Sequence, residues 1–159
     1  MNAPLAYLHE TAPAAGTAVS VAPGIEWLCM PLPFALNHIN LWLLADGAGF
    51  AAVDTGFALD PVKEAWKSAL AGRRLTRSIV THCHPDHLGL AAWLEQETGA
   101  PLWIAQGEYL AAHMMAEQVA GYAIPAMVEF FRRHGLDRAR MDALIARGNG
   151  YKRGVPEIP

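Results

Sequence analysis

Residues 81–87 read Thr-His-Cys-His-Pro-Asp-His, which brings three imidazoles and one carboxylate into six consecutive positions. Neutral imidazole and carboxylate are nitrogen and oxygen ligands that zinc and similar divalent metals accept. A lone histidine is usually a satisfied polar residue, but four potential ligands packed this closely favour a metal site.

The spacing inside this stretch favours two metal ions side by side. In an extended segment, residues two positions apart point to the same side, so His82 and His84 can approach one ion together. Pro85 disfavours helical geometry at His84 and stiffens the loop. The chain then turns into a helix, and Asp86 and His87 reach the site from a different direction, which suits a second ion.

Hydrophobic side chains around the histidines are interpreted as core. Cys83 lies one position after a histidine ligand, so its side chain is expected to point away from the metal and into the interior. Tryptophans on predicted strands and helices are also expected to be buried, and these are Trp42, Trp66, Trp93 and Trp103.

Outward from this stretch, strands and helices alternate along the chain. Asp60 is predicted to cap a helix that has Pro61 at its first position, and Gly99 is predicted to end another helix. Such an alternation is typical of a sheet with helices packed on it, which places the chain in the α/β (α+β) class. The predicted strands span residues 19–22, 25–32, 39–45, 50–53, 78–81 and 102–105, and the helix before Gly99 spans residues 88–98.

The chain is predicted to be one domain whose last part is helical. Residues 1–18 are rich in Ala and Pro and are expected to form a flexible lead-in to a domain over residues 19–159. Within that domain, residues 106–147 are predicted to be a helical insertion, followed by a loop. Its helices are expected at residues 108–120 and 126–134, with a third that begins at Asp137 as its cap.

The composition is that of a globular protein and excludes several classes of partner. The 159 residues are 53% hydrophobic and carry a net charge of -3, which disfavours nucleic acid as a partner. No apolar run is long enough to cross a bilayer, and the two cysteines suit a reducing compartment, so we expect a cytoplasmic protein. The basic residues between Arg132 and Arg153 could bind an anionic small-molecule substrate or form an ordinary solvated face.

Two motifs of this chain resemble those of the metallo-β-lactamase superfamily. One is His-x-His-x-Asp-His at residues 82–87, and the other is Val-Asp-Thr-Gly at residues 53–56, which closes a hairpin and precedes a helix. The resemblance extends over about residues 19–105, and the helices after Gln106 look like an insertion seen in a subgroup of these hydrolases. It implies an αββα sandwich, incomplete in this chain, with a metal site at the sheet edges.

The resemblance also implies a reaction and a cofactor. Members use a metal-bound hydroxide on substrates such as esters, thioesters and lactones, so we expect a metal-dependent hydrolase. The implied cofactor is Zn2+, with two ions per complete domain, and Fe or Mn are other candidates. His82 and His84 would bind the first ion, and Asp86 and His87 would bind the second.

Two carboxylates receive further roles from the resemblance. Asp86 is the implied catalytic residue, because it would orient the nucleophile as well as bind metal. Asp54 would lie behind the ligands and fix a ligand imidazole or the ligand loop. A purely structural role for Asp54, which is to brace the turn before Asp60, is an equally good reading of the sequence.

The chain departs from the family after His87. The family supplies a further histidine, a bridging aspartate and a last histidine from the second half of the sandwich, whereas only His113 and His134 follow here. His113 is expected on a helix face and His134 at the carboxyl end of a helix. We therefore expect the sequence to be the N-terminal half of a longer domain, which alone binds metal weakly and turns over no substrate.

Two alternatives to a hydrolase remain open at this point. A mononuclear iron persulfide dioxygenase resembles the hydrolases in the histidine motif, so an oxidoreductase of that kind also fits. The chain could instead be a non-catalytic interaction module that retains the metal loop and docks through the helices of residues 106–147. Bound metal would favour an enzyme, and a stable metal-free chain would favour the module.

Overall fold

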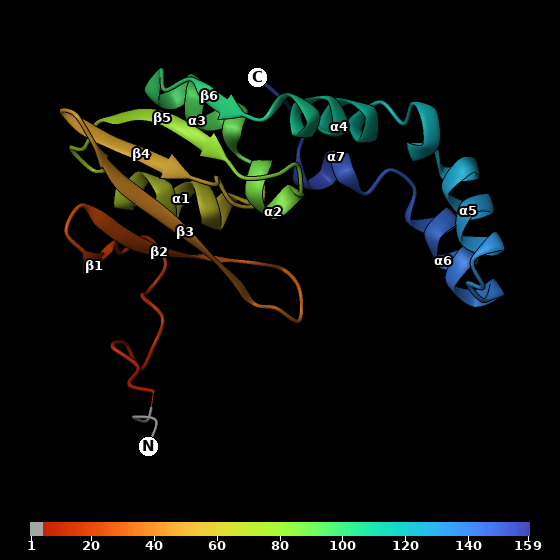
Figure 1. Ribbon diagram of the computed structural model, residues 1–159, viewed down its shortest axis with the longest axis horizontal. Helices are drawn as coiled ribbons and strands as arrows, with labels where there is room; N and C mark the ends of the chain where they lie inside the picture. The colour runs from red at the N-terminus through yellow and green to blue at the C-terminus, as the bar shows by residue number, and fades with distance from the viewer. Residues whose placement is uncertain (1–4) are drawn as a thin grey trace.

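The computed structural model describes residues 5–159, which form a mixed α/β fold around one six-stranded sheet (Figure 1). The strands follow one another across the sheet in chain order. The first four are antiparallel, and the last three run parallel to one another because helices connect them. The strands are β1 (Val19–Ala22), β2 (Ile25–Pro31), β3 (His38–Asp46), β4 (Gly49–Val53), β5 (Leu75–Val80) and β6 (Leu102–Ile104).

The helices fall into two groups along the chain. The first group connects the parallel strands and consists of α1 (Asp60–Ala69), α2 (Pro85–Leu88) and α3 (Ala91–Thr98). The second group follows the sheet, and α5 and α6 lie side by side at the end of the molecule away from it (Figure 1). Its members are α4 (Gln106–Ala116), the short 3-10 helix η1 (Ala120–Tyr122), α5 (Ile124–Arg133), α6 (Arg138–Arg147) and α7 (Tyr151–Gly154).

The main core lies between one face of the sheet and the helices α1 and α3. The predicted burial of Trp66 on α1 is confirmed, since its side chain is completely buried and its indole N–H donates to the Thr55 carbonyl at 2.8 Å. Burial of this apolar area is the main force that fixes the two helices on the sheet. The buried residues of this cluster are Leu28, Met30, Leu41, Leu43, Ala52, Val62, Ala65, Trp66, Ala69, Leu75, Leu90, Leu94 and Ala100.

The other face of the sheet carries a row of apolar side chains that cross it at one register. Two of them, Trp27 and Trp42, stack with ring centroids 6.5 Å apart. At the end of the row, Trp103 on the edge strand is 54% exposed, so its predicted burial is wrong. The Arg77 guanidinium lies 4.4 Å from the centre of the Trp103 ring and covers part of it. The row consists of Trp27, Trp42, Val53, Ile79 and Trp103.

The predicted strands and helices are confirmed with shifted ends. The strand predicted at residues 78–81 begins earlier, at Leu75, and ends at Val80. The helix predicted at residues 88–98 is interrupted, because α2 ends at Leu88 and α3 begins only at Ala91. Gly99 ends α3 in the left-handed conformation with φ 72°, as predicted.

The cap predicted for α1 is wrong by one residue. Leu59 is the N-cap, with extended backbone angles and no capping side chain, and Asp60 is already the first helical residue. The Asp60 carboxylate is almost fully exposed and faces Lys63 at 3.8 Å instead of the backbone. By contrast, the cap predicted at Asp137 is confirmed, since its side chain accepts a hydrogen bond from the Arg140 amide at 2.9 Å.

The segment after the sheet is helical as predicted, with two differences. Helix α4 begins at Gln106 and ends at Ala116, before the predicted end, and residues predicted as loop form α7. His134 is the C-cap of α5, where its Nδ1 donates to the Phe130 carbonyl at 2.7 Å, so its predicted place at a helix end is confirmed. His113 lies on α4 beside Tyr109, with ring centroids 4.6 Å apart.

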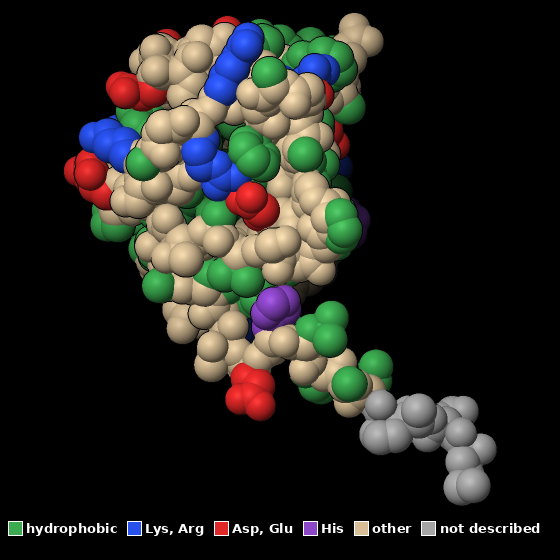
Figure 2. All heavy atoms as spheres, turned by 90° about the vertical axis from the view of Figure 1, so that its left-hand side faces the viewer, with side chains coloured by type: hydrophobic (Ala, Val, Ile, Leu, Met, Phe, Trp, Pro, Cys, Tyr) green, Lys and Arg blue, Asp and Glu red, His purple; other side chains and the backbone are tan. Residues whose placement is uncertain are grey.

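The residues before the first strand lie partly against the main core. Residues 5–18 form neither helix nor strand, but Gly16 lies against α1 and Ala18 packs on the main core. Residues 1–4 of the predicted lead-in lie outside the described part of the chain. On the end of the molecule opposite α5 and α6, basic side chains lie next to acidic ones (Figure 2). Among the described residues, no helix combines the length and the apolar character needed to span a membrane.

Candidate functional site

The histidine stretch and the Val-Asp-Thr-Gly motif meet at one edge of the sheet. Strands β4 and β5 are parallel neighbours, with Val53 beside Ile79, so the residues that follow each strand emerge side by side. Loops that follow parallel strands are where α/β folds commonly place binding and catalytic groups. The pairing of these two strands therefore brings Asp54 next to Thr81, although they are 27 residues apart in sequence.

Asp54 is buried and holds three separate groups. Its carboxylate accepts hydrogen bonds from the Thr81 amide at 2.7 Å and from the Thr81 hydroxyl at 2.9 Å. It also accepts a hydrogen bond from His87 Nδ1 at 2.8 Å. Asp54 has a positive φ of 64°, a left-handed conformation that aspartate tolerates better than most residues and that recurs at functional sites. The residue thus fixes both ends of the histidine stretch.

His87 is held in one tautomer by this contact. Since Nδ1 donates its hydrogen to Asp54, Nε2 carries the free lone pair in the neutral ring, and it lies 3.6 Å from Asp86 Oδ2. Burial alone would lower the pKa of His87, but the hydrogen bond and charge of Asp54, together with the charge of Asp86, raise it overall. The ring is therefore oriented by one carboxylate and faces a second.

The three histidine rings of the stretch lie together. The His82 ring centroid is 3.9 Å from that of His87 and 4.6 Å from that of His84. Burial, reinforced by the neighbouring His87 and His84, lowers the pKa of His82, so its ring is neutral at neutral pH. His84 has φ -63° and ψ 147° and is the N-cap of α2, which agrees with the extended backbone predicted before Pro85.

Thr55 and Gly56 support the C-terminal end of the histidine stretch, at His87. The Thr55 amide and hydroxyl both donate to the His87 carbonyl at 2.7 Å, and the hydroxyl accepts from the Leu90 amide at 3.2 Å. Gly56 has φ +85°, and a Cβ there would lie 2.8 Å from a methyl group of Val62, so a glycine is required. The Val-Asp-Thr-Gly motif therefore positions the histidine loop through both its side chains and its backbone.

Cys83 is buried between the metal-ligand candidates, and its backbone is held from the helical segment. The side chain is 8% exposed and packs with Val80 and Val155, so its predicted place in the core is confirmed. Its amide donates to Glu108 Oε2 at 2.9 Å, and its carbonyl accepts from the Tyr151 hydroxyl at 2.6 Å. Burial and the contact with Glu108 raise the pKa of the Cys83 thiol to about 11, which makes it a poor nucleophile at neutral pH.

Glu108 and Tyr151 were not identified from the sequence as supports of the loop. Glu108 gave a weak signal, because it is acidic in the stretch of residues 78–131 that contains no basic residue. Hydrogen bonds from the Cys83 amide and from its side chain lower the pKa of Glu108. Tyr151 lies 68 residues from its partner and gave no signal at all. Both residues show that α4 and α7 help to hold the histidine loop.

The side chains at this site are of the types that bind a metal ion, but their arrangement provides only part of a metal site. Three imidazoles and the carboxylate of Asp86 are the donor types that zinc binds, and the contact of His87 with Asp54 is the usual support of a metal-bound histidine. Within residues 5–159, however, no three His, Cys, Asp or Glu side chains are placed so that they could hold one ion together. The stretch therefore presents part of a ligand set.

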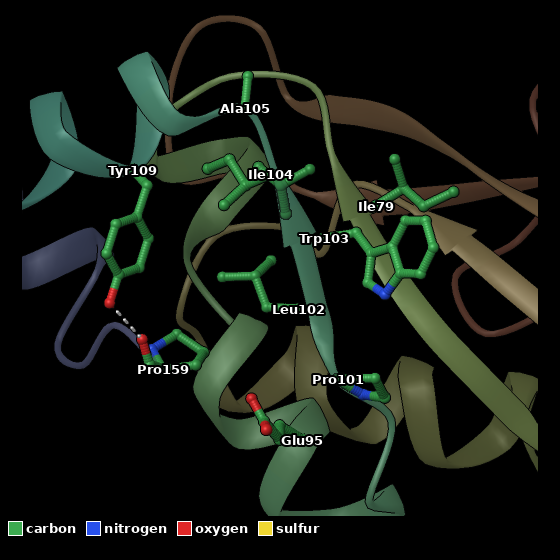
Figure 3. A pocket seen from close by; sticks show the side chains of 10 residues that line it. Ile79, Glu95, Pro101, Leu102, Trp103, Ile104, Ala105, Tyr109 and Pro159 are labelled. Atoms are coloured by element: carbon green, nitrogen blue, oxygen red, sulfur yellow. Dashed lines mark hydrogen bonds between the residues drawn. The ribbon is translucent and has the colours of Figure 1, made fainter.

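A cavity of about 280 Å³ opens beside the histidine loop. His84 and Asp86 line it from the loop, and Phe57 and Arg153 line it from neighbouring segments. This cavity is smaller than a groove of about 750 Å³ that runs along the edge strand β6 (Figure 3). The groove is lined mostly by apolar groups, and Tyr109 closes one end by donating to the Pro159 carbonyl at 3.0 Å. Only the smaller cavity touches the candidate ligands.

Comparison with solved structures agrees with this architecture. The chain is 41% identical to a beta-lactamase domain protein from Burkholderia ambifaria, with a TM-score of 0.77 over 94% of this chain and 44% of that one. It is 27% identical to a metallo-beta-lactamase family protein from Thermus thermophilus, with a TM-score of 0.63 over 79% of this chain and 42% of the other.

Over a shorter segment, the chain is also similar to an enzyme of known name. The chain is 40% identical over 84 residues to a hydroxyacylglutathione hydrolase from Pseudomonas aeruginosa strain LESB58, which is 52% of this chain and 32% of that protein. The chain thus spans only about a third of that relative's length. The family model of the metallo-beta-lactamase superfamily matches residues 36–147, which include both motifs and the loop they build. The chain belongs to the metallo-beta-lactamase superfamily.

Proposed function

We propose that this protein is a metal-dependent hydrolase of esters or thioesters, with His82, His84, Asp86 and His87 as metal ligands. The observation that carries the proposal is the 2.8 Å contact between His87 Nδ1 and the buried Asp54 carboxylate. This contact leaves Nε2 of His87 free and aimed at a site that also contains the rings of His82 and His84.

Each residue has a separate task in the proposed reaction. Asp54 keeps the proton on Nδ1 of His87 and holds the loop through Thr81. His82 stays neutral because its pKa is lowered, so its ring can donate a lone pair. Asp86 would orient a water molecule and accept its proton at the carboxylate. A bound zinc ion would supply a lowered water pKa and would polarise the substrate carbonyl.

The proposed substrate class follows from the relatives and is coarser than a named compound. The Pseudomonas aeruginosa relative is called a hydroxyacylglutathione hydrolase, and the acyl group of such a substrate is joined to glutathione through sulfur. We therefore place a thioester first among the candidate substrates. Because this chain covers only 32% of that relative, the complete ligand set and the activity of the whole protein are part of the proposal. Zinc is the proposed metal, two ions per complete domain, with Fe or Mn as alternatives.

The test compares hydrolysis with oxidation in the protein that the gene encodes. Thiol release from a hydroxyacylglutathione should require added zinc and should fall about a hundredfold or more in the His84→Gln and Asp86→Asn variants. The His134→Gln variant is the control. Because the His134 ring lies at the C-terminal end of α5, its replacement should leave the rate unchanged. Oxygen uptake with glutathione persulfide, without thioester hydrolysis, would contradict the proposal. So would hydrolysis that survives removal of the metal.

A further inference from the structure

Most basic side chains in the described part of this protein have an acidic partner. Among residues 5–159, nine of the twelve Lys and Arg side chains lie within 4.0 Å of a carboxylate oxygen. The surface in Figure 2 shows basic and acidic side chains lying next to each other in the same way. In this described part of the chain, the three without such a partner are Arg74, Arg147 and Arg153.

Two of these three arginines approach each other at one point. Arg147 ends α6 and Arg153 lies in α7, and the loop between the two helices passes beneath them at Gly150. A Cβ on Gly150 would lie 2.8 Å from Arg147 Nε and 3.2 Å from Arg153 Nη2. A side chain at this position would push the guanidinium groups away, so the glycine allows both to share one spot. Two like charges held together in this way favour the binding of an anion.

The arginine pair shares a cavity with the proposed metal ligands. The cavity of about 280 Å³ is lined by Arg147 and Arg153 and also by His84 and Asp86. Although Asp86 lines the same cavity, neither of its oxygens lies within 4.0 Å of the two guanidinium groups in the described chain. Asp86 is thus not neutralised by the arginines, and both guanidinium groups are free to bind an anion that enters the cavity.

The other side chains that line this cavity indicate which chemical groups suit the rest of the ligand. Phe34 and Phe57 line the same cavity and meet edge to face, with ring centroids 5.4 Å apart. A second cavity of about 310 Å³ shares Arg147 and Gly150 with the first and extends between apolar side chains. Those apolar side chains come from α5 and α6 and include Ile124, Met127 and Leu144. The two cavities therefore suit a ligand that carries a negative group next to apolar parts.

We propose that Arg147 and Arg153 bind a carboxylate or phosphate group of the substrate and thereby place its scissile bond beside His84 and Asp86. The planar guanidinium group suits both anions, because it presents two parallel N–H donors to a pair of oxygens. This inference rests on the proposed function for the identity of the bond that is cleaved. The anion site itself rests only on the arginines, Gly150 and the cavity.

Titration of the chain with two unreactive anions tests the site. S-methylglutathione supplies carboxylates, adenosine 3′,5′-bisphosphate supplies phosphates, and the NMR signals of the arginine Nε–H groups report binding. We expect one of the probes to shift the Arg147 and Arg153 signals, and each Arg→Gln variant to weaken binding about tenfold. Arg74→Gln is the matched control, since Arg74 also lacks an acidic partner in the described chain but precedes β5. Its affinity for both probes should be that of the unmodified chain.

The outcomes separate this inference from the proposed function. The probe that binds identifies the anion, and binding of either probe in an arginine-dependent manner supports the site. Absence of binding at millimolar probe, or equal affinity in the Arg147→Gln and Arg153→Gln variants, would overturn it. A chain that binds zinc but neither probe contradicts the anion site alone. A chain that binds a probe but no zinc contradicts the proposed hydrolase and leaves the anion site standing. Circular dichroism of each variant shows that it is folded.

Discussion

The sheet and the α5–α6 pair differ in how completely they bury their apolar side chains. The sheet shares one buried core with α1 and α3, in which side chains such as Leu41 and Trp66 are completely buried. By contrast, α5 and α6 bury no residue completely, and their apolar side chains are at most half-buried. Their ion pairs, such as that between Glu129 and Arg132 at 2.7 Å, lie on the surface within a single helix and do not replace a core.

This contrast separates the candidate metal ligands from the arginine pair. The candidate ligands follow β5 and are braced by Asp54 and Thr55, so they stand on the rigid part. The arginine pair comes from the end of α6 and from α7, which adjoin the loosely packed part. Segments with little buried apolar area open more readily than a core. Under the two proposals, the metal ligands are therefore fixed by the sheet, and the substrate anion binds beside the more loosely packed helices.

Removal of one leucine from each region should give the largest difference in stability between them. We expect Leu41→Ala, at a completely buried position in β3, to destabilise the fold by about 3 kcal/mol because it leaves a cavity. Leu144→Ala in α6, at a half-buried position, should cost about 1 kcal/mol or less. Urea unfolding followed by tryptophan fluorescence measures both. Equal losses would show that α6 belongs to the same cooperative core.

Asp54→Asn tests the bracing of the rigid part. Asparagine tolerates the left-handed backbone at this position but lacks the charge that orients His87 and holds Thr81. We expect a loss of about 2 kcal/mol in stability, as for hydrogen bonds to a charged group, and a loss of about 10- to 100-fold in zinc affinity. Competition with a chromophoric chelator measures the affinity. Unchanged zinc binding would leave Asp54 with a structural role only.

Tyr151→Phe tests the link between the two regions. The variant removes the hydroxyl that donates to the Cys83 carbonyl and leaves the ring in place. We expect a loss of about 1 kcal/mol and faster hydrogen exchange at the amides of residues 81–87. Tyr109→Phe is the matched control, because its hydroxyl bonds only to the Pro159 carbonyl at 3.0 Å in the described chain. If both variants exchange alike, α7 does not brace the loop.

The smallest effect is expected from an ion pair on the surface of α5. Hydrogen bonds from Arg132 and Arg133 lower the pKa of Glu129 from 4.5 to about 2. A carboxyl whose pKa is lowered on folding stabilises the protein above its ordinary pKa, and that contribution is lost as the pH falls through the lowered value. The Glu129→Gln variant should therefore have a slightly less ordered α5 than the unmodified chain at neutral pH. The difference should disappear between about pH 4.5 and about pH 2.

The carbon chemical shifts of α5 residues measure how ordered this helix is in the Glu129→Gln variant and in the unmodified chain. The contribution of Glu129 is small because its side chain is 43% exposed and water screens the charges. Added salt should reduce the difference between the two proteins in the same way as acid. A difference that persists at low pH would mean that Glu129 acts through packing instead of charge.

The sequence indicates where the candidate site lies because its signals are local. The ligand types, their spacing and the proline after His84 all lie within residues 81–87, and the strands on either side carry clear apolar patterns. The Val-Asp-Thr-Gly motif was also recognisable, since it follows a hairpin. What the sequence left open was the role of Asp54, and the structure places its carboxylate against His87 Nδ1.

Long-range contacts explain what the sequence could not predict. The break between α2 and α3 is at Gly89, where a Cβ would collide with the carbonyl oxygens of Pro85, Gly56 and Gly154. Three distant segments meet there, so local helix propensity had no information about it. The exposure of Trp103 likewise depends on β6 being the edge strand within the described chain, which its own apolar pattern does not reveal.

Zinc titration of the chain, followed through the histidine side-chain NMR signals, tests whether the loop of residues 82–87 binds metal. We expect Nε2 of His87 to shift while its Nδ1 proton stays bonded to Asp54, and the rings of His82 and His84 to shift with it. The signal of His134, which caps α5, should not move. Zinc that shifts His134 or other distant histidines and leaves residues 82–87 unchanged would contradict a metal site in this loop.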